Sequence, residues 1–192
     1  MSTLILRPNS DSHRGLISSS GADHYALVDE TSLNEADYVW VDGGASSQTL
    51  YDTFGYPDHS TESETINSVT VKAYCKKAVT GTDASNVRIR PQVSIGGTGY
   101  YGAAQNLTSS TALYTKAWTT NPATSSAWSW TNIDNLIAGI ELTSHYTDKN
   151  NNVDAICYQL WVEVDYGESG SSTVFLPNIM KHNFIPPMIG GY

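Results

Sequence analysis

The chain has 192 residues, a formal net charge of −9 and a pI near 4.8. Its length suits one domain with a substantial core. Because Lys and Arg are few and scattered, the composition argues against direct binding to nucleic acid or to anionic membranes. No apolar run reaches the roughly 20 residues that a membrane helix requires.

The first residues, "MSTLILRPNSDSH", enter a strand-like run at once, so we expect no secretory leader. We therefore expect the chain to fold in a cytoplasm. Scarce helix formers and abundant Ser, Thr, Tyr and Val then predict short strands separated by Gly- and Asn-rich turns. In chain order these strands are 3–8, 24–29, 37–42, 48–54, 65–79, 86–95, 112–118, 138–146 and 157–166. Such spacing predicts an all-β, antiparallel, jelly-roll-like β-sandwich over residues 1–167.

Three local signals refine this prediction. Pro91 places its strand at an edge or marks a bulge, because proline donates no backbone hydrogen bond. The stretch "GGTGYYG" (96–102) predicts a hairpin turn. One helix is expected near residues 131–139, capped by Thr131 and ended by Gly139.

The stretch "CYQLWVEVDY" (157–166) alternates as a half-buried strand does. Tyr158, Leu160, Val162, Val164 and Tyr166 form its apolar face, so Trp161 falls among the polar residues. By the same parity Cys157 faces the polar side, whereas Cys75 faces the core of its own strand. We therefore expect two free thiols.

"ESGSS" (168–172) marks a boundary, and the segment after it fits no periodic pattern. This segment is too apolar for a typical disordered tail. We expect residues 168–192 to form an extended C-terminal arm that docks on a neighbouring subunit, although folding back over its own domain is the alternative. Its partner-binding residues would be Phe175, Leu176, Ile179, Met180, Phe184, Ile185, Met188 and Ile189, together with Trp161.

Signals for chemistry are weak. Asp148, Asn150, Asn152 and Asp154 have the spacing of a calcium loop, but Val153 replaces the required glycine, and a polar hairpin tip is the simpler interpretation. The five His are isolated, and neither a nucleophile elbow nor a phosphate loop is present. We predict no metal and no cofactor.

Glu163 and Asp165 share a face with Trp161, which resembles a sugar-cleaving groove. Outward carboxylates are, however, also the ordinary decoration of a solvated strand. We therefore predict that the chain is not an enzyme. Trp161, Tyr100 and Tyr101 remain as candidates for stacking on glycans, since Tyr and Trp suit surfaces that are half wet.

The stretches "LILRPNSD", "HYALVDE", "DYVWVDG", "NPATSSAWSWTNIDNLIAGIEL" and "YQLWVEVDYG" resemble small β-sandwich structural proteins of tailed bacteriophages. The similarity spans roughly residues 3–167 and lies in pattern and arrangement. It implies a virion component of the capsid decoration (cement), head-fibre or tail-associated type, without catalytic residues. It implies nothing about the arm.

We accordingly predict a non-enzymatic structural virion protein that self-associates as a homo-oligomer and anchors to a capsid or tail protein through its arm. The alternative is an aromatic-lined carbohydrate- or receptor-binding module of a phage tail or fibre, with a glycan as partner.

Overall fold

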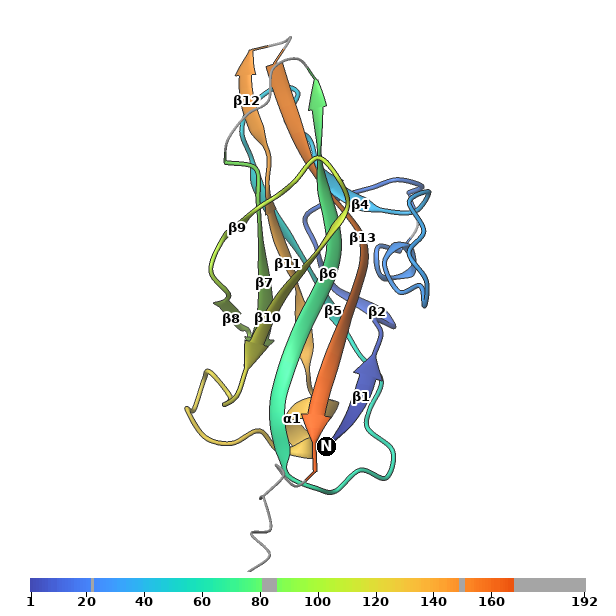
Figure 1. Ribbon diagram of the computed structural model, residues 1–192, viewed down its shortest axis with the longest axis vertical. Helices are drawn as coiled ribbons and strands as arrows, with labels where there is room; N and C mark the ends of the chain where they lie inside the picture. The colour runs from blue at the N-terminus through green and yellow to red at the C-terminus, as the bar shows by residue number, and fades with distance from the viewer. Residues whose placement is uncertain (22, 81–85, 149–150, 168–192) are drawn as a thin grey trace, which may run out of the picture.

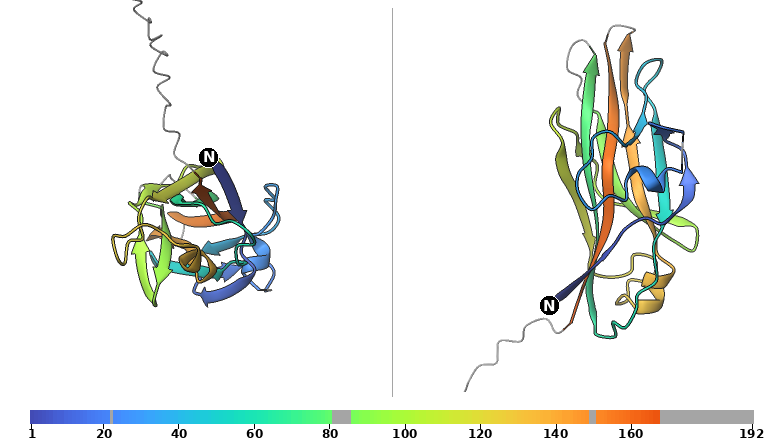
Figure 2. Two further views of the ribbon diagram at one scale, coloured as in Figure 1. Left: turned by 90° about the horizontal axis from the view of Figure 1, so that it is seen from below. Right: turned by 90° about the vertical axis from the view of Figure 1, so that its right-hand side faces the viewer.

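The computed structural model describes residues 1–21, 23–80, 86–148 and 151–167. Two antiparallel sheets pack face to face along one long axis, with the short helix α1 at one end (Figures 1 and 2). The predicted all-β antiparallel sandwich is therefore confirmed. The predicted C-terminal arm lies outside the described residues, so the arm and its eight apolar residues stay a prediction.

Sheet A is built around two long strands, β6 and β13, which pair over nearly their whole length. These two strands extend along most of the long axis (Figure 1). The strands of sheet A are β1 (Ser2–Leu6), β3 (Ile17–Ser18), β4 (Val39–Val41), β6 (Ile66–Thr80), β10 (Ala112–Trp118), β12 (His145–Asp148) and β13 (Asn151–Tyr166).

Sheet B has β11 at its centre, between β5 and β7. Its strands are β2 (Ser10–Arg14), β5 (Thr49–Gly55), β7 (Arg88–Ile95), β8 (Thr98–Tyr101), β9 (Gln105–Asn106) and β11 (Ile137–Thr143). Successive long strands alternate between the sheets, because the chain passes from β5 to β6, β7, β10, β11 and β13. This alternation gives the chain path its jelly-roll character.

The core lies between the two sheets and is made by every second residue of the long strands. On β6 the predicted inward residues Val69, Val71, Ala73 and Cys75 are all fully buried, as predicted. Ile140 and Leu142 of β11 face them from sheet B and are equally buried. The period-two pattern of the sequence therefore gives the core correctly in regular strands.

A β-bulge at Tyr158 breaks this pattern in β13. Cys157 pairs with Cys75, but the next pair is Gln159 with Tyr74, so one residue of β13 is extra. The extra residue reverses the parity of the strand. Tyr158 therefore does not join the core with Leu160, as the alternation predicted, but packs against the Tyr38 ring, with ring centroids 5.7 Å apart, and beneath Lys76.

The bulge also corrects the prediction for Cys157. Its side chain is fully buried in the core rather than on the polar face, and it lies directly across from Cys75. Both cysteines are free, so the expected free thiols are confirmed, although the reason given for them was wrong.

Several predicted boundaries also change. Residues 24–29 do not form a strand but contain the 3-10 helix η1 (Tyr25–Leu27), whereas the polar "SDSHR", expected as a loop, forms β2. The helix α1 (Trp130–Asp134) is shorter than predicted and is capped by Ser129 through a capping box with Asn132. Gly139 does not end a helix, because it lies within β11.

Pro91 occupies neither an edge strand nor a bulge, since β7 pairs with β11 on one side and with β8 and β9 on the other. It is tolerated because β9 reaches residues 88–89 and β8 reaches residues 92–95, which leaves Pro91 between the two short strands. The β7–β8 turn is the predicted hairpin, with Gly96 and Gly97 at φ of 58° and 81°. Within the described ranges, no helix has the length and apolar character needed to cross a bilayer.

Among the described glycines of sheet B, Gly139 leaves the least space for a side chain. A Cβ at this position would lie 2.0 Å from the backbone oxygen of Asp52, which cannot move without breaking the β5–β11 pairing. We therefore expect Gly139→Ala to lower the free energy of unfolding by about 3 kcal/mol or more. At the control position Gly44, an added Cβ meets only the flexible carboxylate of Asp42. Urea denaturation should show a change within about 0.5 kcal/mol for Gly44→Ala, and equal midpoints for both variants would contradict the assignment.

Candidate functional site

The outer face of sheet B carries a row of side chains that crosses five strands. The strand register aligns His13 of β2 with Thr53, Thr53 with Gly139, Gly139 with Gln92, and Gln92 with Tyr101 of β8. Because Gly139 has no side chain, the protein surface is depressed at the middle of this row. The side chains at the two ends of the row project further outward. The result is a hollow of about 230 Å³, which we call the aromatic hollow.

Aromatic rings form the two raised ends. At one end His13 stacks on Tyr51, with ring centroids 4.2 Å apart and an interplanar angle of 18°. At the other end Tyr101 lies beneath the guanidinium of Arg90, whose Cζ is 4.4 Å from the ring centroid. Tyr51 remains 37% exposed, so its ring is available to a ligand.

Gln92 forms part of the wall and floor between these rings. Its side chain is only 1% exposed, and its Nε2 is buried without a hydrogen-bond partner among the described residues. Leaving a buried amide unpaired costs roughly 1–3 kcal/mol. Because Nε2 has almost no exposed surface, a ligand in the hollow would contact it only after the Gln92 side chain moved.

The phenol of Tyr101 keeps its proton at neutral pH. Burial, together with the nearby negative charge of Glu141, raises the pKa of Tyr101 above its ordinary value. The hydroxyl can therefore both donate and accept a hydrogen bond.

A second hollow of about 700 Å³ continues along β7 and β11 from the first. Arg90 and Glu141 line it, and their ion pair has an N–O distance of 3.1 Å. This pair neutralises both of its charges. Arg88 also lines the second hollow and donates a hydrogen bond of 2.7 Å to Asn86 Oδ1, so this hollow keeps a positive charge.

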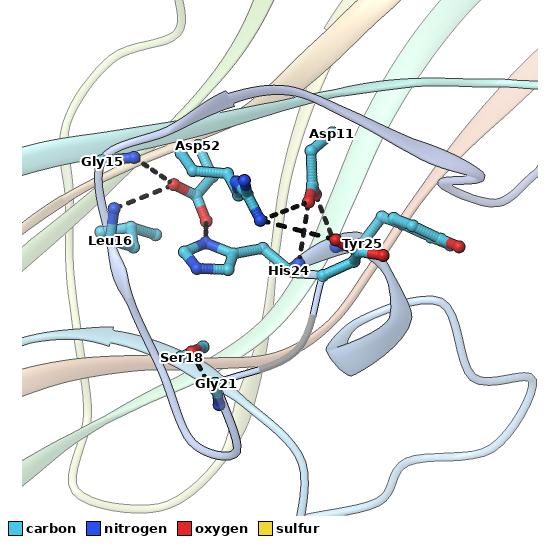
Figure 3. Close-up of polar contacts among 10 residues, drawn as sticks. Asp11, Gly15, Leu16, Ser18, Gly21, His24, Tyr25 and Asp52 are labelled. Carbon is cyan, nitrogen blue, oxygen red and sulfur yellow. Dashed lines mark hydrogen bonds and ion pairs between the residues drawn. The ribbon is translucent and has the colours of Figure 1, made fainter.

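A polar cluster beside residues 15–16 and 24–25 fixes the β2 edge of the site (Figure 3). Asp52, fully buried on β5, accepts hydrogen bonds from the amides of Gly15 and Leu16 at 2.8 and 2.9 Å. Its other oxygen lies 2.7 Å from Nδ1 of His24. Asp11 of β2 in turn accepts the amides of His24 and Tyr25. These bonds hold β2 against β5 and so keep His13 over Tyr51.

Trp161 lies on the opposite side of the molecule, on the outer face of sheet A. Its ring centroid is 5.7 Å from that of Tyr74 and 5.8 Å from the guanidinium of Arg7. Together with Leu33 and Ile5, these residues line a hollow of about 410 Å³, which we call the Trp161 hollow. Ile5 and Leu33 are 54% and 43% exposed there. The polar-face tryptophan of the sequence thus forms part of an apolar surface patch.

The predicted glycan residues therefore do not form one site. Tyr101 belongs to the aromatic hollow, Trp161 to the other sheet, and Tyr100 points inward, where it packs against the core. Tyr100 and Tyr101 are consecutive on β8, and successive side chains of a strand point to opposite faces of the sheet. The two rings therefore cannot belong to one site. No local motif links the other lining residues, so the sequence did not indicate His13, Tyr51, Thr53, Gln92, Arg90 or Glu141 as site residues.

The carboxylates beside Trp161 are held in ordinary polar contacts. Glu163 lies 2.7 Å from Nζ of Lys72 and accepts a hydrogen bond of 2.9 Å from Trp161 Nε1. Burial acts to raise the pKa of Glu163, but the hydrogen bonds from Lys72 and Trp161 and the charge of Lys72 outweigh it, so the pKa is lowered. Asp165 accepts a hydrogen bond from Thr3. Glu163 is therefore ionised at neutral pH and unsuited to act as a general acid.

The calcium-loop resemblance is only partly within the described residues, because residues 149–150 are not. Asp154 accepts the amide of Gly43 at 2.8 Å, and Gln159, at the position of the usual bidentate glutamate, donates instead to the Glu30 carbonyl. In the described part of the chain, no group of three or more His, Cys, Asp or Glu residues is placed to hold a metal ion.

No protein-family model matches the sequence, and no curated protein matches it. Among solved structures, the fold is similar to the CBM22-1 xylan-binding domain of Paenibacillus barcinonensis Xyn10C, at 12% identity over 86% of this chain and 95% of that chain, with a TM-score of 0.42. It is also similar to TmCBM61 in complex with β-1,4-galactotriose, at 8% identity over 83% of this chain and 86% of that one, with a TM-score of 0.40. A CBM4 structure gives 15% identity over 85% and 94% of the two chains, again with a TM-score of 0.40. Likenesses this distant identify neither a family nor a ligand.

The hydrogen bonds that Asp52 accepts should stabilise the folded protein strongly. Asp52→Ala would leave two backbone amides and His24 without their acceptor, and we expect it to lower the free energy of unfolding by about 3–5 kcal/mol. Asp52→Asn retains one carbonyl oxygen and should cost less.

Urea denaturation measures both effects. Asp165→Ala, which removes an exposed carboxylate bonded to Thr3, is the matched control and should change stability by no more than about 0.5 kcal/mol. An Asp52→Ala variant as stable as this control would contradict the role of the cluster.

Proposed function

We propose that this chain is a non-catalytic carbohydrate-binding module and that its glycan lies on the outer face of sheet B. The observation that carries the proposal is the hollow itself, in which the rings of Tyr51 and Tyr101 flank Gln92 on the outer face of sheet B. A sugar ring has apolar C–H faces and a rim of hydroxyl groups. Aromatic rings suit its faces, and buried polar groups suit its rim.

The charge of the site favours a neutral glycan. The lining of the aromatic hollow contains no Lys, Arg, Asp or Glu, and the chain carries a net charge of −9, so neither this hollow nor the whole protein attracts anions. The same balance disfavours acidic sugars and phosphorylated ligands. The two adjoining hollows along β7 and β11 favour an oligosaccharide over a single sugar unit.

The binding test uses the full chain and a panel of neutral oligosaccharides, measured by titration calorimetry. We expect Tyr101→Ala and Tyr51→Ala each to weaken binding about tenfold or more, because each removes one aromatic contact worth about 1.4 kcal/mol. Trp161→Ala is the matched control, since it removes an aromatic ring from the opposite face. Loss of binding in Trp161→Ala but not in Tyr101→Ala would contradict the proposed site. Failure of the whole panel to bind would contradict the proposed function.

Self-association is a second candidate function, favoured by the Trp161 hollow. Large apolar side chains rarely gather on a free surface, yet Ile5, Leu33 and Trp161 line this one hollow on sheet A. A second copy of the chain that covered them would bury apolar area at roughly 25 cal/mol per Å². The virion setting and the anchoring arm stay predictions beside it, because residues 168–192 lie outside the described part of the chain.

Analytical ultracentrifugation tests this second candidate. Leu33→Asp places a charge in the proposed contact and should shift the protein toward monomer, with glycan binding unchanged because sheet B is unaffected. Thr61→Asp, at an exposed position outside this hollow, is the control and should leave the oligomer intact. A wild-type chain that sediments as a monomer at all concentrations would contradict the proposal.

A further inference from the structure

The two thiols of the chain are neighbours across the central strand pair. Cys75 of β6 and Cys157 of β13 are register partners, and both side chains are fully buried in the core. Both are free. The alignment depends on the bulge at Tyr158, which turns Cys157 toward the core.

The hydrogen-bonding pattern shows which kind of pair they form. The Lys77 amide donates to Thr108, on the β10 side of β6, so it points away from β13. The Leu160 amide of β13 donates to Val28 rather than to its β6 partner Ala73. Residues of β6 two positions apart point the same way, so the Cys75 amide also points away from β13. Cys75 and Cys157 are therefore a non-hydrogen-bonded pair.

Such pairs bring side chains closest together. Their Cα atoms are about 4.5 Å apart, which lies inside the roughly 4.4–6.8 Å range that disulfides span. This separation is well below the roughly 7 Å beyond which a disulfide would require backbone movement. The pairing thus meets the geometric condition for a cross-strand disulfide.

We propose that Cys75 and Cys157 are an oxidisable pair that closes into a disulfide between β6 and β13 when the folded protein meets oxidising surroundings. The oxidant is a small disulfide of the glutathione class. One cysteine thiolate attacks it, forms a mixed disulfide and releases one small thiol. The second cysteine, after losing its proton, attacks the protein sulfur of the mixed disulfide and displaces the second small thiol. Two protein thiols are oxidised, and one small disulfide is reduced to two thiols.

Burial makes this reaction slow in the native state. Desolvation, together with the hydrogen bond and the charge of Cys157, raises the pKa of the Cys75 thiol well above its ordinary value. Cys157 Sγ lies 3.5 Å from the Gln159 carbonyl oxygen as a weak donor. Since the thiolate is the attacking species, oxidation depends on local opening of the β6–β13 pair. Low concentrations of urea should therefore accelerate it.

The disulfide would strengthen the strand pair on which both sheets depend. It closes a loop of about 80 residues, for which chain-entropy arguments predict substantial stabilisation of the folded state. We expect the oxidised protein to unfold about 5–10 °C higher than the reduced protein. A protein assembled in a reducing cytoplasm would gain this cross-link only after release from the cell.

The test incubates the full chain with oxidised glutathione at pH 8, with and without low urea, and follows intact mass and maleimide labelling after denaturation. We expect loss of two hydrogens, disappearance of both labelled thiols and a higher thermal midpoint. Cys75→Ala and Cys157→Ala are the matched controls, and each should stop at a single glutathione adduct.

Persistence of two labelled thiols in the oxidised wild-type chain, in low urea as well as without it, would overturn the proposal. So would a wild-type chain that ends, like the single variants, in glutathione adducts alone. Glycan titration on the same samples is independent of either result, because the aromatic hollow contains neither cysteine.

Discussion

The bulge at Tyr158 is the constraint on which the rest of sheet A depends. β6 and β13 pair over fourteen register positions, and one extra residue in β13 shifts the parity halfway along. On the C-terminal side of the bulge, Leu160, Val162 and Val164 fill the core. On its N-terminal side, Val153, Ala155 and Cys157 do so. Without the bulge, one half of the strand would turn its apolar residues to solvent. The same shift places Trp161 outward and the two sulfur atoms face to face.

The sandwich gives the chain two independent outer faces with different chemistry. Sheet B presents aromatic rings with amide, hydroxyl and paired charged groups, which suits a hydroxyl-rich ligand. Sheet A presents Trp161 with exposed aliphatic side chains, which suits another protein surface. Because the core separates them, one face can be occupied while the other stays free. A module that must sit in an assembly and still reach a ligand needs this separation.

Sequence patterns predicted what is regular and local. The inward face of β6, the Gly96–Gly97 turn and the sandwich class follow from alternation and turn chemistry. The bulge could not be predicted, because "CYQLWVEVDY" alternates almost without a break and the extra residue is revealed only by its partner strand. β2 was missed since "SDSHR" has no apolar residue; buried Asp52 and the amides around it hold that strand in place. The aromatic hollow needs the register of five strands, which no local window contains.

The outer faces of both sheets carry a cationic side chain paired with a carboxylate. On sheet B Arg90 is paired with Glu141, and on sheet A Lys72 is paired with Glu163. Each pair lies beside an aromatic ring, Tyr101 in one case and Trp161 in the other. A partly exposed pair of this kind contributes little to stability, typically no more than about 1 kcal/mol. Its effect is to fix long side chains around the ring and cancel their charges, so that shape, stacking and hydrogen bonding decide what binds. Individual contacts of these kinds are weak, and useful affinity then requires either a ligand long enough to fill both hollows of sheet B or several copies of the chain acting together.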